Sequence, residues 1–98
     1  MTDEQITDFL VDAEAGNYGW FVYDVIPSHP SVQGRIRELD EDGSPVAFFT
    51  FTHATIKRGI VLEAKRQGLS VTDFIEQYDA SDADNAVQLG ILGEIRYA

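Results

Sequence analysis

Residues 78–98 read YDASDADNAVQLGILGEIRYA, and they predict a capped terminal helix followed by a short extended tail. Ser81 is expected to be the N-cap, because the acids that follow it would meet the positive end of the helix. Gly93 is expected to end the helix. Small and apolar residues repeat between these positions at helical spacing, namely Ala83, Ala86, Val87, Gly90 and Ile91. The pattern favours close approach of another backbone, and Gln88 is the large polar residue beside that face.

Two further helices are predicted upstream of this stretch. The first is expected to begin after Thr52, to turn Ile56, Ile60 and Ala64 inward, and to end at Gly68. The second is expected to begin at Ser70 or Thr72. After the terminal helix, residues 94–97 are expected to form a short edge strand.

The N-terminal half predicts one helix and three strands. Thr2 and Gln5 have the spacing of a capping box, which predicts a helix over residues 3–15. Alternating patterns predict strands over residues 20–26, 32–39 and 46–51, joined by turns rich in Pro, Gly and Asp. The expected fold is therefore α+β: an N-terminal helix, a three-stranded antiparallel meander, then three helices packed on the sheet, in one domain over residues 1–98.

Composition limits the classes of function. The chain has 98 residues, no Cys and a net charge of −10, so disulfides and Cys-based metal sites are excluded and direct nucleic acid binding is disfavoured. No apolar run approaches the roughly 20 residues of a membrane span, and the N-terminus is acidic where a secretory signal is basic. We therefore expect a cytoplasmic protein without membrane contact.

The first predicted helix carries Glu4, Asp8 and Asp12 at successive i, i+4 positions and contains no basic residue. Like charges at this spacing destabilise a helix slightly, which suggests a cationic neighbour. Two explanations stay open. In the first, the acids are solvated or lie near the chain's own Lys57, Arg58, Lys65 and Arg66. In the second, they face a basic partner protein.

Motifs for catalysis or metal binding are not found in the sequence. His29 and His53 lie in different segments, and neither belongs to a metal-ligand spacing such as HxH or HExxH. Phosphate-cradling and nucleophile motifs are missing as well. We expect a protein that is not an enzyme and has neither a metal nor a cofactor.

Aromatic and Arg residues follow the first helix closely. Tyr18 and Trp20 precede the first predicted strand, and Arg35 and Arg37 lie on the strand expected to pair with it. Aromatic faces stack on planar groups and Arg binds phosphate in a bidentate manner, so the set suits a planar ligand that carries phosphate. The alternative is that Tyr18 and Trp20 only pack the helix onto the sheet.

Three segments of the chain resemble a family of small, largely uncharacterised proteins encoded by tailed phages and prophages. The family pattern has an early AEGGxxYW, a central TxxxIxxG and a closing ADxxxQxxxFGExxYG. Positions that match it are Ala13, Glu14, Gly16, Tyr18, Trp20, Thr52, Ile56, Gly59, Ala83, Asp84, Gln88, Gly93, Glu94 and Tyr97. Gly19 is an insertion, Leu92 replaces the usual Phe, and Ala98 replaces the usual Gly.

The resemblance implies a phage accessory protein that works in the host cytoplasm by binding. One hypothesis is counter-defence by sequestration of a nucleotide-derived signal molecule, in a homo-oligomer closed by the small-residue helix face. Its ligand-binding residues would be Tyr18, Trp20, Arg35, Arg37, Gln88, Glu94 and Tyr97. The other is an acidic decoy or DNA mimic that inhibits a basic host defence protein through Glu4, Asp8, Asp12 and the acids of residues 40–42.

Overall fold

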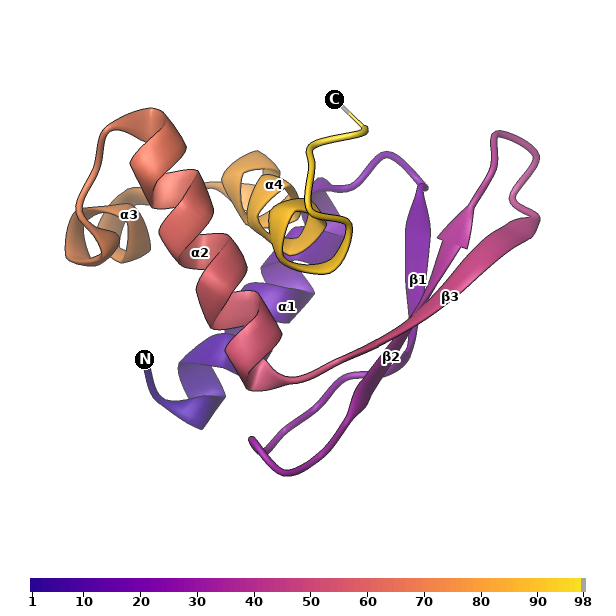
Figure 1. Cartoon of the computed structure of the whole chain (residues 1–98), viewed down its shortest axis with the longest axis horizontal. Coiled ribbons are helices and arrows are strands. Elements are labelled where there is room, and N and C mark those ends of the chain that lie inside the picture. Colours follow the sequence, from indigo (N-terminus) through magenta and orange to yellow (C-terminus); the bar gives the residue numbers. More distant parts are fainter. Residues whose placement is uncertain (98) are drawn as a thin grey trace.

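The computed structural model describes residues 1–97 and has the predicted order of one helix, three strands and three helices. The elements are α1 (Asp3–Gly16), β1 (Phe21–Val25), β2 (Gly34–Leu39), β3 (Pro45–Phe51), α2 (His53–Gln67), α3 (Val71–Gln77) and α4 (Ala80–Ile91). In Figure 1 the helices gather on one side of the three-stranded sheet, which leaves the opposite side of the sheet uncovered. The expected α+β meander with a helical layer is therefore confirmed.

The three strands form an antiparallel sheet in the order β1-β2-β3, so β2 is central. Gly34, Ile36 and Glu38 alternate along β2 as buried residues and face the helices, as expected of a strand with one covered face. Arg35 and Arg37 occupy the alternate positions and face outward. A register shift lies between Tyr23 and Val25 of β1.

A hydrophobic core lies between the helices and the inner face of the sheet. It is built from Ile6, Phe9, Leu10 and Ala13 of α1, Ile56, Ile60 and Ala64 of α2, Ala83, Ala86 and Val87 of α4, and Trp20, Phe21, Ile36, Phe51 and Phe74. The residues expected to face inward on α1 and α2 do so, because their spacing places them on one side of each helix.

Helices α2 and α4 lie unusually close together. A Cβ added to Gly59 would lie 2.0 Å from the carbonyl oxygen of Ala86, and one added to Gly90 would lie 2.6 Å from that of Thr55. The small face of α4 thus provides the close backbone approach that the sequence predicts. This face is buried against α2 within one chain, so it is not available to a second copy, and the homo-oligomer itself stays a prediction.

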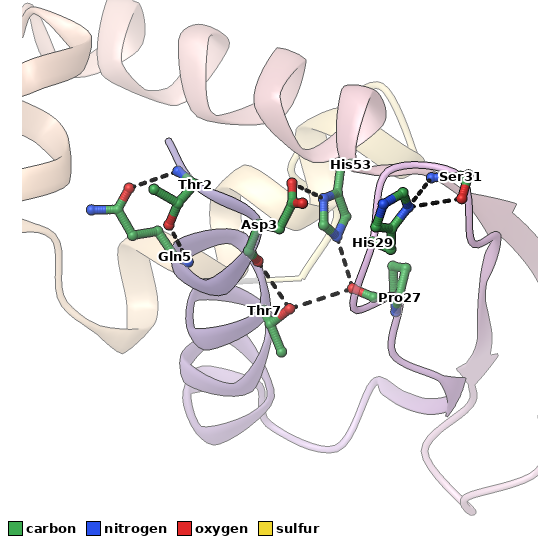
Figure 2. A network of polar contacts seen from close by, with 8 residues as sticks. All are labelled: Thr2, Asp3, Gln5, Thr7, Pro27, His29, Ser31 and His53. Carbon is green, nitrogen blue, oxygen red and sulfur yellow. Dashed lines mark hydrogen bonds and ion pairs between the residues drawn. The ribbon is translucent and has the colours of Figure 1, made fainter.

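Polar contacts attach the β1–β2 loop to the N-terminal ends of α1 and α2. Figure 2 shows the buried imidazole of His53 between Asp3 and Pro27, with Nε2 2.8 Å from the Pro27 carbonyl oxygen. A carbonyl only accepts, so Nε2 carries the proton of this bond. The hydroxyl of Thr7 donates to the Asp3 carbonyl at 3.0 Å in the same network. The buried side chain of His53 therefore helps to hold the β1–β2 loop against the helices.

No helix within residues 1–97 is long and apolar enough to cross a membrane.

Candidate functional site

The first turn of α4 differs from the prediction. Asp79, rather than Ser81, is the N-cap: its side chain accepts the N–H of Asp82, and the Asp82 carboxylate accepts the N–H of Asp79 in return. Ser81 lies within the helix. The Asp79 carboxylate satisfies the same free amide groups and carries a charge that the helix dipole favours, so the helix begins two residues earlier than expected.

Asp84 is buried and does not act as a helix-terminal charge. Its side chain reaches the segment that precedes β1, where the indole N–H of Trp20 donates to Oδ1 at 2.7 Å. Gln88, one turn further along α4, donates to Oδ2 at 3.2 Å. Burial raises the pKa of Asp84, while the hydrogen bonds from Trp20 and Gln88 oppose that rise. Asp84 therefore joins α4 to the start of the sheet.

The buried amide of Gln88 fixes the C-terminal tail. Its Oε1 accepts the N–H groups of Arg96 and Tyr97, both at 2.8 Å, and its Nε2 donates to the Tyr97 carbonyl at 2.8 Å. The side-chain amide thus satisfies the backbone groups of the tail that a neighbouring strand would otherwise bind. Residues 94–97 are not a strand, so the expected edge strand is wrong.

Tyr97 brings the tail onto the sheet. Its ring stacks on Trp20 with centroids 5.0 Å apart and planes 9° apart, and its hydroxyl donates to the buried carboxylate of Glu38. This hydrogen bond, together with burial, raises the pKa of the Tyr97 phenol. Arg96 pairs with Glu38 at 3.1 Å and with Glu94 at 3.0 Å. The guanidinium of Arg96 therefore already has two carboxylate partners.

A groove of about 600 Å³ opens between this tail and the β2–β3 turn. Its aromatic part consists of Tyr18, Trp20 and Tyr97, and the Tyr18 side chain is 80% exposed. Asp40 and Glu41 line the other side, and Arg96 is its cation. A second recess of about 320 Å³ lies on the α4 side of Tyr18 and Tyr97.

The expected ligand-binding residues are only partly brought together. Asp84 joins Trp20 to Gln88, and Tyr97 stacks on Trp20 and is hydrogen-bonded to Gln88. Tyr18 lies at the edge of the same region. Glu94 is exposed and contacts Arg96.

Arg35 and Arg37 lie apart from this region. They are on the outer face of β2, where Arg37 pairs with Asp24 of β1 at 2.9 Å. They line neither the groove nor the recess. The expected set of aromatic rings with these two Arg side chains is therefore not assembled, because strand alternation points the Arg residues away from the helices.

The residues of the alternative surface also separate. Glu4 and Asp8 of α1 are exposed, whereas Asp12 is partly buried and its Oδ2 accepts the hydroxyl of Tyr78 at 2.7 Å. Asp12 thus has a structural partner. Asp40 accepts the N–H groups of Asp42 and Ser44 in the β2–β3 turn, both at 2.9 Å.

Sequence reasoning missed Glu38 and Arg96 as members of the site. Glu38 shares the inner face of β2 with Ile36, and an acid at such a position signals a specific partner. Its partners Arg96 and Tyr97 lie in the C-terminal tail, which has neither the helical nor the strand periodicity of apolar residues, so no pattern in the sequence identifies them. Residues 1–97 contain no cluster of three or more side chains suited to hold a metal ion.

Comparisons of the chain with protein-family models, curated protein sequences and solved structures give no match. The resemblance to phage proteins therefore remains a prediction, and Ala98, the last position of its closing motif, lies outside the described residues.

Proposed function

We propose that this protein is a non-enzymatic binding protein that occupies a basic surface of another protein. The observation that carries the proposal is the acidic face of α1, formed by Glu4 and Asp8, which takes part in no ion pair within residues 1–97. The ion pairs within residues 1–97 join Arg37 to Asp24, Arg66 to Glu63, Arg96 to Glu38 and Glu94, and His53 to Asp3. Glu4 and Asp8 belong to none of them.

The basic residues of the chain also form no ion pair with these two acids within residues 1–97. Arg66 is engaged by Glu63, and Arg58 donates to the carbonyl of Gly90. Lys57 and Lys65 form no ion pair within the described part of the chain. In the free protein Glu4 and Asp8 face solvent, and a basic protein surface that covered them would supply the complementary charge, which supports the proposal.

The acids of the β2–β3 turn form a separate surface. Figure 1 places the N-terminal end of α1 and this turn at opposite ends of the molecule. One compact partner surface therefore does not cover both, and we assign the partner to the acidic face of α1. In a phage setting the partner would be a host defence protein whose basic surface normally binds nucleic acid.

Paired charge variants test the proposal. The immobilised protein and a Glu4→Gln/Asp8→Asn variant are incubated with host lysate, and bound proteins are eluted with a salt gradient and identified. A control variant, Asp73→Asn/Glu76→Gln, removes the same charge from exposed positions on α3. We expect a basic protein that elutes at moderate salt and is lost only with the α1 variant. Equal capture by all three forms would refute the proposal.

The groove supports a second candidate function, the sequestration of a small planar molecule. Tyr18, Trp20 and Tyr97 provide the aromatic surface for stacking. Asp40 and Glu41 would repel phosphate groups, and Arg96 is already paired. A ligand with few negative charges fits the groove better than the expected nucleotide. Native mass spectrometry after incubation with infected-cell extract tests this candidate, and a retained mass that Tyr18→Ala abolishes would support it.

A further inference from the structure

The smaller recess, of about 320 Å³, lies where the end of α1, the start of α4 and the C-terminal tail meet. Its walls are formed by Tyr18, Arg66, Ser81, Asp84, Asn85, Ile95 and Tyr97. Its volume is at the lower end of the range for small-molecule sites, about 300–1,000 Å³. The recess therefore suits one small group rather than an extended ligand.

Asp84 gives this recess a buried carboxylate without a counter-charge. Only 3% of the residue is exposed, and its hydrogen-bond partners, Trp20 and Gln88, are both neutral. None of the ion pairs within residues 1–97 includes Asp84. A buried charge is costly unless it is paired, so a cation that entered the recess would gain an interaction that the chain itself does not supply.

The other groups around the recess do not cancel this charge. Arg66 is the cation that lines the recess, but its Nε and one of its two terminal nitrogens, Nη2, already donate to the buried carboxylate of Glu63. Asp82, close to Arg66, adds a further negative charge. The aromatic side chains of Tyr18 and Tyr97 also line the recess, and aromatic rings of this kind attract cations.

We propose that this recess binds a cationic head group, an ammonium or a guanidinium, with Asp84 as its counter-ion and Tyr18 and Tyr97 beside it. The group belongs either to a free amine or to a Lys or Arg side chain of a partner protein. The recess lies beyond the C-terminal end of α1, whereas Glu4 and Asp8 lie in the first half of that helix. The proposal therefore does not depend on the acidic face of α1.

Trp20 supplies a specific reporter for the test. It is the one Trp of the chain, and its indole N–H donates directly to Asp84, so a single indole resonance reports on this carboxylate. The ¹⁵N-labelled protein is titrated with n-butylammonium and with agmatine at constant ionic strength. The neutral alcohol n-butanol is the matched control. We expect a saturable shift of the indole resonance with both cations and none with the alcohol.

Variants of the recess decide whether the shift comes from the proposed site. Asp84→Asn should weaken binding at least tenfold, and Tyr18→Ala, at a largely exposed residue, should weaken it about two- to fivefold. Asp73→Asn, on the surface of α3, should leave it unchanged. Should Asp84→Asn fail to fold, the Tyr18→Ala titration still tests the site. An indole resonance that does not move with either cation, or moves equally in Tyr18→Ala and the wild type, would overturn the proposal.

A peptide arm distinguishes the two sources of the cation. An acetylated and amidated Gly-Lys-Gly peptide is titrated in the same way. Binding of the peptide as tight as that of n-butylammonium supports a partner side chain as the natural occupant, and binding of the free amines alone supports a small molecule. Both outcomes are read from the indole resonance, so they are independent of the result of the capture experiment on Glu4 and Asp8.

Discussion

Replacement of Gly59 by Ala should destabilise the protein, although Ala is the best helix former. The added Cβ would lie 2.0 Å from the Ala86 carbonyl oxygen, and ordinary contact begins at 3.4 Å, so α2 and α4 must separate by about 1.4 Å. Overpacking of this kind costs about 1–3 kcal/mol, and the obstacle here is backbone, which favours the upper end. The intrinsic preference for Ala over Gly returns about 1 kcal/mol. We therefore expect a net loss of roughly 2 kcal/mol in the free energy of unfolding.

Urea unfolding followed by Trp20 fluorescence measures this loss, because Trp20 is the single Trp and is 4% exposed in the folded protein. The same loss corresponds to a fall in Tm of roughly 8–16 °C for a domain of this size. Lys57→Ala, on the exposed side of the same helix, is the control and should change stability by no more than about 0.5 kcal/mol. A Gly59→Ala variant as stable as the wild type would show that the close approach of α2 and α4 is not required.

Three further predictions concern buried polar groups. Gln88→Leu should lower stability by about 1–3 kcal/mol and speed hydrogen exchange at the Arg96 and Tyr97 amides, as measured by NMR; unchanged exchange would mean that the tail is held by other contacts. Burial raises the pKa of Glu63, but hydrogen bonds from Arg66, Asn85 and Gln67 outweigh it and hold the pKa below its usual 4.5. The resulting stability is present above pH 4.5 and lost as the pH falls through the folded-state pKa, so the difference between wild type and Glu63→Gln should shrink below pH 4.5 in urea titrations. Burial, followed by the hydrogen bond to Asp12, raises the pKa of Tyr78 from 10.0 to about 12. The protonated phenol therefore contributes stability that is fully present below pH 10 and is lost as the pH rises towards 12. Urea unfolding should show this loss in the wild type, and the free energy of unfolding of Tyr78→Phe should not fall for this reason.

The fold was predictable because each element has a strong local pattern. The capping box of Thr2 and Gln5 and the apolar period of α1 both depend only on neighbouring residues, and both are found in the structure. The start of α4 was not predictable in this way, because Asp79 and Ser81 are both good N-caps and local preference does not separate them. The bonds of Asp79 with Asp82 decide the start.

The candidate site was much less predictable, because its contacts join distant parts of the chain. The alternation of β2 already places Arg35 and Arg37 opposite Ile36, and this argument separates them from a helix-facing pocket. Trp20 precedes β1, so alternation does not give its direction. That its indole meets Asp84 follows only from the packing of α1 against α4.

The contacts of Trp20 and Glu38 with the end of the chain also govern how the protein folds. The bonds Trp20–Asp84, Glu38–Arg96 and Asp12–Tyr78 join residues 64, 58 and 66 positions apart. To form any of these contacts, the chain between the two residues must first close into a long loop, and this closure costs conformational entropy. The meander and the individual helices can form early from local contacts, but α1 completes its packing only when α4 arrives. We therefore expect folding in a single slow step, slower than that of a helical bundle of the same length.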